Sequence, residues 1–231
     1  MAERRQRVYG GMSAEERRHQ RRTALIGAGL ELFGTIGYPS VSVKRICDEA
    51  GLTQRYFYES FADREALLGE VYRHCVERLR STTLDSAAAY LSAAGLPSTG
   101  VPTDSVAPLA RLVLGAFVDA LTQDRRVARI ILIEVVGISQ ELEALRIGAI
   151  HDWADLILGF TSGEDAADPR SRLAAIGFVG AFTQLLVDWQ MATTHPISAD
   201  AGPDLFTPAA IHDVATEMLI GAYQRVINTA E

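Results

Sequence analysis

The clearest pattern of apolar and polar positions lies at residues 42–61, where two short amphipathic helices flank a glycine. Apolar side chains recur at helical spacing in the first of them, at Val43, Ile46, Cys47 and Ala50. We expect Ser42 to cap this helix, Gly51 to end it, and Thr53 to cap the second helix, which spans about residues 54–59. This order of helix, glycine turn and short helix predicts a helix-turn-helix, the layout of many DNA-reading domains.

Helical periodicity continues on both sides of this segment. Ser13 and Glu16 have the spacing of a capping box at the start of a first helix. Asp63 is expected to cap a long helix that ends near Arg80, before a short alanine-rich segment at residues 83–94. Loops rich in proline and glycine then separate further helices, expected at about residues 105–122, 125–137, 139–160, 170–194 and 209–229. Because no run alternates with the period of a strand, the sequence predicts an all-α fold.

A longer set of positions around the turn has a recognisable order. It comprises Ala24-Leu25, Leu30, Leu32, Phe33, Gly34, Gly37-Tyr38, Ser42, Ile46, Ala50-Gly51-Leu52-Thr53, Tyr58, Phe61 and Asp63 to Leu68. In this order the segment from about Ala14 to Leu68 resembles the N-terminal DNA-binding domain of the TetR family of transcriptional regulators. The resemblance implies a flexible basic arm at residues 1–12, a helix-turn-helix domain at 13–62 and a helical effector-binding and dimerisation domain at 63–231.

The same resemblance divides the polar residues near the turn into two groups. Family positions that contact phosphates correspond to Ser42, Thr53, Tyr58 and Arg64, with Lys44 beside them at a helix N-terminus that also favours an anion. Candidate readers of base edges are Arg45, Gln54, Arg55 and Tyr56. Relatives commonly have glycine and a small hydroxyl residue where this chain has Arg55 and Tyr56. We expect Arg55 to read guanine, a pairing that discriminates by about 1–3 kcal/mol; a sequence-independent phosphate contact is the alternative.

Charge is distributed unevenly along the chain, whose formal net charge is -7. Residues 1–80 hold 14 Lys and Arg against 11 Asp and Glu, whereas residues 81–231 hold 8 against 18. The basic side chains are densest at the N-terminus, with Arg4, Arg5, Arg7, Arg17, Arg18, Arg21 and Arg22. An arm of this kind either follows a DNA groove or remains a solvated tail. The asymmetry predicts that the N-terminal part of the chain faces DNA and that phosphate repels the more acidic remainder, residues 81–231.

The last two long helices are expected to form a dimer. By the resemblance they pair with their copies in a second subunit as a four-helix bundle, although an intramolecular core helix is the alternative. The first of them carries a small-residue surface at Ala174, Ala175, Gly177, Phe178, Gly180, Ala181 and Leu185. A homodimer would place two reading helices about 34–36 Å apart, which requires a near-palindromic operator on double-stranded DNA.

Effector contacts in the domain expected at residues 63–231 have to be inferred from its composition. Glu134 is the lone carboxylate in an apolar run at residues 127–138, so it either faces a ligand or pairs with an arginine such as Arg129 or Arg146. Aromatic candidates for lining an apolar chamber are Trp153, Phe160, Phe178, Phe182 and Trp189, and candidate polar anchors are Gln184 and Asp188. Together they predict a small, largely apolar effector.

Other classes of function have little support in the sequence. Cys47 and Cys75 are expected to be buried packing residues, and the five histidines lack metal-ligand spacing. We expect no run to reach the ~20 apolar residues of a membrane span, and no signal peptide is evident, so we expect a cytoplasmic protein without membrane partner, cofactor or metal. The sequence therefore indicates a ligand-responsive DNA-binding repressor without catalytic residues. A constitutive DNA-binding protein and a helical enzyme assembled from distant residues are the alternatives.

Overall fold

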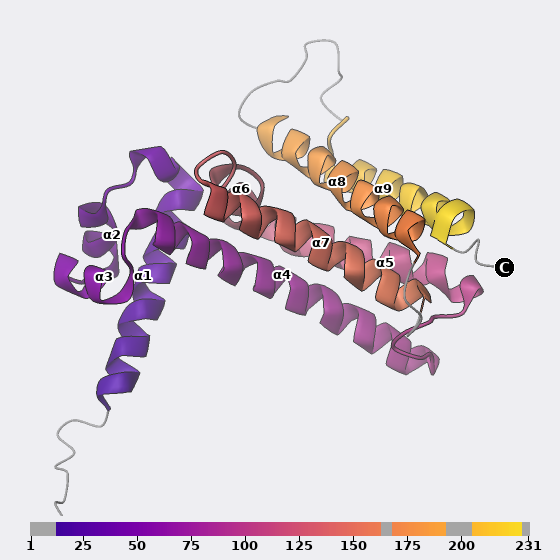
Figure 1. Cartoon of the computed structure of the whole chain (residues 1–231), viewed down its shortest axis with the longest axis horizontal. Coiled ribbons are helices and arrows are strands. Elements are labelled where there is room, and N and C mark those ends of the chain that lie inside the picture. The colour runs from indigo at the N-terminus through magenta and orange to yellow at the C-terminus, as the bar shows by residue number, and fades with distance from the viewer. Residues whose placement is uncertain (1–12, 163–167, 193–204, 228–231) are drawn as a thin grey trace, which may run out of the picture. The chain divides into compact units, whose positions relative to one another are not determined.

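Helices make up all the regular structure in residues 13–162, 168–192 and 205–227, the part of the chain that the computed structural model describes (Figure 1). The predicted all-α fold is therefore confirmed. The chain divides into two units, residues 1–71 and 72–231, and the boundary falls inside the helix α4 (Arg64–Ala94). The predicted basic arm at residues 1–12 lies outside the described residues.

The first unit is a small helical domain. Its elements are α1 (Ala14–Ile36), η1 (Tyr38–Ser40), α2 (Val43–Ala50), α3 (Gln54–Ser60) and the beginning of α4. The predicted capping box is present at the start of α1, where the Ser13 hydroxyl accepts a hydrogen bond from the Glu16 amide at 3.1 Å. Fully buried side chains of α1, α2 and α3, including Leu25, Ile46 and Phe57, form a common core.

One glycine of α1 lies against this core. A methyl group added at Gly29 would come within 2.9 Å of Val71 Cγ2 and 3.3 Å of Leu67 Cδ2, and both of these side chains are fully buried. We expect Gly29→Ala to lower the free energy of unfolding of this unit by about 1–2 kcal/mol, because overpacking outweighs the gain in helix propensity. Gly27→Ala is the matched control, since its methyl group would meet nothing within 4 Å. Chemical denaturation should show Gly27→Ala at least as stable as the unmodified protein, and equal stability of both variants would contradict this packing.

The helix α4 is longer than the sequence suggested. Its predicted cap is present, since the Ala66 amide donates to Asp63 Oδ1 at 2.8 Å, but the helix continues to Ala94 without the expected break after Arg80. The prediction of a separate segment at 83–94 was wrong because the hydroxyl residues bond within the helix. Thr83 donates to the Leu79 carbonyl at 2.8 Å, and Thr82 and Ser86 make the same kind of bond one turn back.

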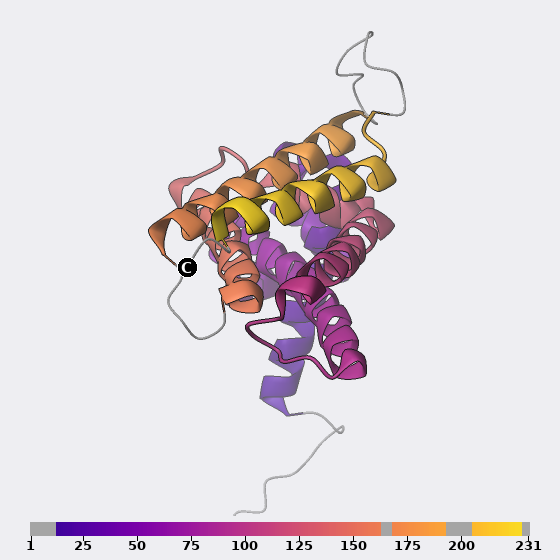
Figure 2. The ribbon, with the colours of Figure 1, turned by 90° about the vertical axis from the view of Figure 1, so that its right-hand side faces the viewer.

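The second unit packs its helices in an irregular bundle (Figures 1 and 2). Besides the rest of α4, it contains α5 (Thr103–Gln123), α6 (Arg125–Arg129), the π-helical turn η2 (Ile130–Glu134), α7 (Gln140–Ser162), α8 (Pro169–Ala192), α9 (Pro208–Ala222) and the π-helical turn η3 (Tyr223–Ile227). The helix α5 packs on α9, α7 packs on α8, and α8 lies beside α9 (Figure 2). The helix expected at 125–137 is instead α6 followed by η2, and Gly137, with a φ of 72°, forms the turn after it.

Two helices of this unit, α5 and α8, are long and apolar enough to cross a membrane by length and composition alone. The expectation that no segment would reach this limit was therefore wrong. Both helices have one buried face, which packs against other helices of the same unit: α5 buries Leu109, Leu114 and Val118, and α8 buries Phe178 and Phe182. Their apolar composition is accounted for by this burial in the core of a helical domain.

Candidate DNA-recognition surface and effector cavity

The turn between α2 and α3 has the geometry that its residues predict. Ser42 caps α2 by accepting a hydrogen bond from the Arg45 amide at 3.2 Å, and Ile46 and Cys47 of this helix are buried. Gly51 ends the helix in the left-handed region, with φ 65° and ψ 31°, a conformation that glycine adopts without steric cost. The next amide, that of Leu52, donates to the Cys47 carbonyl at 2.9 Å. These contacts fix the angle at which α3 leaves α2.

The helix α3 separates an inward face from an outward one. Phe57 is fully buried and its ring lies 6.0 Å from that of Phe61, whereas Gln54, Arg55 and Tyr58 are exposed. The outward face thus carries a long amide, a guanidinium and a phenol, all of which can hydrogen-bond to bases or phosphates. This arrangement is suited to the recognition helix of a helix-turn-helix.

Some of the predicted phosphate contacts are exposed side chains, whereas others already bind groups of their own domain. Lys44 is exposed and its ammonium pairs with Asp48 at 2.6 Å, one helical turn later. Thr53 occupies the N-cap position of α3, but its side chain makes no capping hydrogen bond, contrary to the prediction. Arg64 is half-buried: Nη1 donates to the Tyr38 carbonyl at 3.2 Å and to the Val41 carbonyl, and its guanidinium lies over the Tyr38 ring. Arg64 therefore holds the loop before α2, so its contact with phosphate remains a prediction.

The predicted base readers also differ in their exposure and in the contacts that they already make. Arg45 and Gln54 are exposed, and Arg55 has 84% of its side chain exposed while its Nε donates to Glu59 Oε1 at 2.9 Å. Tyr56 is half-buried beneath the guanidinium of Arg21, which lies 4.4 Å from the centre of its ring. Tyr56 therefore packs against α1 of its own domain as well as bordering the outward face.

Two arginines that the sequence grouped with the basic N-terminus belong to the domain itself. Arg21 covers Tyr56, and Arg22 joins three parts of the unit. Its guanidinium pairs with Glu70 at 3.0 Å, donates to the Ser60 carbonyl at 3.1 Å and lies 4.4 Å from the centre of the Phe61 ring. The residues that they contact lie about forty positions away in the sequence, so no local pattern indicated these contacts.

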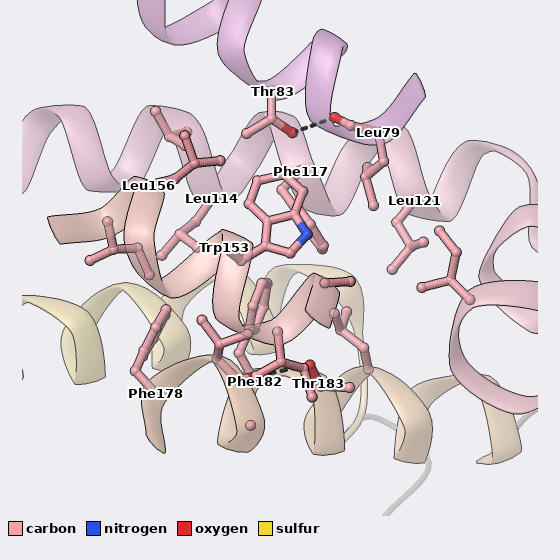
Figure 3. A pocket seen from close by; sticks show the side chains of 18 of the residues that line it. Leu79, Thr83, Leu114, Phe117, Leu121, Trp153, Leu156, Phe178, Phe182 and Thr183 are labelled. Carbon is pink, nitrogen blue, oxygen red and sulfur yellow. Dashed lines mark hydrogen bonds between the residues drawn. The ribbon is translucent and has the colours of Figure 1, made fainter. Parts of the chain in front are cut away.

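The second unit encloses a cavity of about 730 Å³ between α4, α5, α7 and α8, with η2, α9 and η3 also contributing side chains (Figure 3). Its centre is aromatic. The Phe117 ring lies 5.1 Å from the Trp153 ring and 5.3 Å from the Phe182 ring, and Phe178 stacks on Phe182 at 5.9 Å. Leucines from α4 and α5, including Leu79, Leu114 and Leu121, complete much of the wall. The volume is within the range of about 300–1,000 Å³ typical of small-molecule sites.

The sequence identified part of this wall. Among the predicted effector contacts, Trp153, Phe178 and Gln184 line the cavity, as do the further aromatic candidates Phe160 and Phe182. Gln184 is exposed and donates to Asp188 Oδ1 at 2.9 Å.

Glu134 and Asp188 do not line the cavity, so their assignment as effector contacts has to be corrected. Glu134 is buried at 7% exposure because its carboxylate pairs with Arg129 Nε at 2.6 Å, the alternative that the sequence had left open. Asp188 accepts a hydrogen bond from Gln184 instead of reaching the cavity. Trp189, another aromatic candidate, is buried with the guanidinium of Arg125 5.0 Å from the centre of its ring, and it is not among the lining residues.

Several polar lining residues were missed, among them Arg146 and Tyr72. Arg146 belongs to α7 and Tyr72 to α4. Arg146 shares a helical stripe with Ala149, Ile150 and Trp153, all of which line the cavity, and this spacing was a usable signal. Tyr72 gave no such signal, because its apolar neighbours suggested an ordinary core position.

The outer surface of α8 and α9 carries unpaired apolar side chains. Leu173 of α8 is 70% exposed and Val214 of α9 is 51% exposed, and Gly177 of α8 is exposed as well, whereas the exposed Gly180 borders the cavity. Two members of the predicted small-residue surface, Ala175 and Phe178, point into their own unit instead. Helical periodicity explains the difference, since the predicted set spread around more than one face of the helix.

Metal chemistry has no obvious site in this part of the chain. Within residues 13–162, 168–192 and 205–227, no group of three or more histidine, cysteine, aspartate or glutamate side chains is placed to hold a metal ion. Cys47 and Cys75 are both buried, as predicted for packing residues, and burial raises the pKa of the Cys75 thiol to about 12.

Comparison with known proteins agrees with this division of the chain. The family model described as "Bacterial regulatory proteins, tetR family" matches residues 25–71. No protein with a curated description matches the chain by sequence.

Solved structures of bacterial regulators share its fold. The regulator FadR from Bacillus subtilis, determined in complex with stearoyl-CoA, has a TM-score of 0.63 at 16% identity, with 87% of this chain and 98% of that chain covered. The fatty acid degradation regulator FadR from Bacillus halodurans has a TM-score of 0.60 at 16% identity, covering 87% and 95%. A transcriptional regulator from Aquifex aeolicus has a TM-score of 0.54 at 16% identity, covering 86% and 97%. At these identities the likeness is one of fold.

Proposed function

Because the chain belongs to the TetR family of transcriptional regulators, we propose that it is a DNA-binding repressor that a small, largely apolar effector releases from a palindromic operator. Members of the family are transcription regulators and not enzymes. The observation that carries the proposal is that one chain combines a helix-turn-helix with an apolar cavity of about 730 Å³ in a separate unit. We expect the protein to work in the cytoplasm, where its DNA is.

The helix α4 provides the covalent link between DNA binding and effector binding. Its residues Leu67 and Val71 are buried in the first unit, while Leu79 and Thr83 line the cavity of the second. An effector that binds one position of α4 better than another shifts the population of the DNA-binding conformation. A tenfold loss of operator affinity requires about 1.4 kcal/mol of differential effector binding between the two conformations.

The exposed apolar residues of α8 and α9 support a homodimer. Leu173 and Val214 are large side chains that this chain alone leaves in solvent, and Gly177 would let a second helix approach closely. A two-fold dimer of this kind presents two α3 helices to successive major grooves. The operator then has two half-sites about 34–36 Å apart, or a multiple of that spacing.

The nature of the effector follows from the cavity wall. Its lining is mostly leucine, valine, isoleucine and aromatic side chains, which favour an apolar or amphipathic molecule. One regulator of the same fold, FadR from Bacillus subtilis, was determined in complex with stearoyl-CoA. We infer that a molecule with a long hydrocarbon chain is the effector class to examine first.

The proposal is tested by selecting bound duplexes from a random DNA pool with the purified full-length protein at two salt concentrations. We expect enrichment of a palindrome, with affinity falling steeply as salt rises. The enriched duplex then serves as the probe for release by hydrocarbon-chain compounds. Failure to enrich any sequence would contradict the DNA-binding role, and enrichment without release by any apolar compound would favour a constitutive DNA-binding protein.

Arg55 and Lys44 should affect DNA binding in different ways. We expect Arg55→Ala to weaken binding to the selected operator by about 1–2 kcal/mol and to relax specificity at one base pair per half-site. The loss is at the low end of that for a bidentate base contact because Arg55 must first leave Glu59. Lys44→Ala should weaken binding to all sequences alike, as loss of a phosphate contact does. Fluorescence anisotropy with operator and scrambled duplexes distinguishes the two, and equal losses on both duplexes for Arg55→Ala would identify it as a phosphate contact.

A further inference from the structure

We propose that Tyr72 and Arg146 form a polar end of the cavity that binds the carboxylate of a long-chain fatty acid. This inference rests on the proposed function of the cavity as an effector site and names the chemistry that it recognises. It comes from a tyrosine hydroxyl and a single cation that both line a cavity whose wall is mostly apolar.

The hydroxyl of Tyr72 lacks a hydrogen-bond partner among the described residues although its side chain is only 4% exposed. Other lining hydroxyls are satisfied locally: Thr83, Thr161 and Thr183 donate to backbone carbonyls of their own helices, and the Tyr223 hydroxyl lies 3.3 Å from that of Thr103. Tyr72 is thus a lining hydroxyl that can donate a hydrogen bond to a bound molecule.

Arg146 is the only charged side chain among the residues that line this cavity in the described part of the chain. Its Nε and Nη2 both lie 2.9 Å from Glu143 Oε2, and the other oxygen of Glu143 accepts from the Gly137 amide at 2.9 Å. Glu143 thus orients the guanidinium while using two of the five N–H donors of an arginine. The remaining donors are available to an oxygen of a ligand.

Tyr72 and Arg146 both line the cavity and interact electrostatically. Burial raises the pKa of the Tyr72 hydroxyl to about 12, and the charges of Arg146 and Glu143 both act on that pKa, in opposite directions. The phenol therefore stays protonated near neutral pH and can donate a hydrogen bond. A neutral donor next to a guanidinium matches a carboxylate, which accepts several hydrogen bonds and is bound best by charge-assisted ones.

This pairing predicts which head groups the site prefers. A fatty acid places its hydrocarbon chain against the aromatic wall of Phe117 and Trp153 and its carboxylate at Tyr72 and Arg146. An alcohol of the same length keeps the apolar contacts but carries no charge for the guanidinium. An amine of the same length brings a cation next to Arg146, which is unfavourable unless Glu143 leaves its present partners.

The inference is tested by isothermal titration calorimetry of the full-length protein with four probes of one chain length: hexadecanoic acid, hexadecanol, hexadecylamine and palmitoyl-CoA. We expect the acid to bind at least about tenfold more tightly than the alcohol, as a charge-assisted hydrogen bond would give. Arg146→Met should weaken the acid about tenfold and leave the alcohol within about twofold. Tyr72→Phe should weaken the acid several-fold.

Each variant has a matched control. Tyr223→Phe removes a hydroxyl that also borders the cavity but already has a protein partner, and Arg172→Met removes an exposed arginine that does not line it. Both controls should keep the preference of the unmodified protein for the acid. The comparison of head groups on that protein needs no variant, so misfolding of Arg146→Met would leave the test intact.

The outcomes separate this inference from the proposed function. Equal affinity for the acid and the alcohol, or a preference for the amine, would overturn carboxylate recognition while leaving the cavity as an apolar effector site. Tight binding of palmitoyl-CoA without the acid would likewise overturn it and identify a thioester instead. Binding of none of the four compounds would overturn both the inference and the proposed apolar effector.

Discussion

Arg129→Met should lower the free energy of unfolding of the second unit by about 3 kcal/mol. The reason is that the Glu134 side chain has only 6% of its surface exposed and its carboxylate lies 2.6 Å from Arg129 Nε. Removing one partner of a buried ion pair leaves the other charge in a poorly solvated site, which typically costs about 3–5 kcal/mol. We place the effect at the lower limit because the Arg129 side chain is one-third exposed, at 33%.

Two further variants test whether this loss of stability comes from the burial of the ion pair. Arg172 pairs with Asp155 on the surface, where both side chains are nearly half exposed, so Arg172→Met should change stability by no more than about 0.5 kcal/mol. The double variant Arg129→Met, Glu134→Leu removes both charges and should recover most of the loss. Urea denaturation measures all three. Equal losses for Arg129→Met and Arg172→Met would contradict the account of a buried pair.

Leu114→Trp should abolish effector binding while operator binding remains. Leu114 projects from α5 into the cavity, so an indole there would occupy part of the 730 Å³ that an effector needs (Figure 3). We expect affinity for the best hydrocarbon-chain ligand to fall at least about 100-fold, equivalent to about 2.7 kcal/mol. Because the ring enters existing space, stability should be nearly unchanged, unlike the usual result of overpacking a filled core.

Leu112→Trp is the control for this substitution. Leu112 lies two positions earlier on α5 and is 37% exposed, and it is not among the cavity residues. The same indole at that position should leave both calorimetric ligand binding and ligand-dependent release from the operator unchanged. If Leu114→Trp bound the ligand normally, the cavity could not be the effector site; if it lost operator binding without ligand, the substitution would mimic the bound state.

The sequence was most informative where local chemistry determines structure. Ser13, Ser42, Gly51 and Asp63 marked helix ends that the structure confirms, because a capping hydrogen bond or a left-handed turn depends on a few adjacent residues. It failed at the α4 segment around Thr83, where hydroxyls that often end helices bond back to their own helix. Helix boundaries of this kind depend on packing as well as on propensity.

The candidate sites show the same limit. Aromatic residues such as Trp153 and Phe178 were correctly placed on the cavity wall because large apolar side chains at helical spacing tend to point inward. Charged residues were harder to place. Glu134 found its partner five positions earlier, whereas Arg146 reached the cavity, and the sequence offered both arginines as partners for the same carboxylate. Only the packing of the helices decides between them.

The π-helical turn η2 gives the cavity a simple route to change over evolution. Ile131, Leu132 and Ile133 of this turn line the cavity, and a π turn holds one residue more than an α-helical turn of the same span. Deleting a single codon there would leave an ordinary α-helical turn of about the same span, so the flanking residues would keep their orientation while the side chains within the turn changed position. A new set of side chains would then face the ligand on an unchanged scaffold, so a one-residue deletion could alter effector specificity in a descendant regulator.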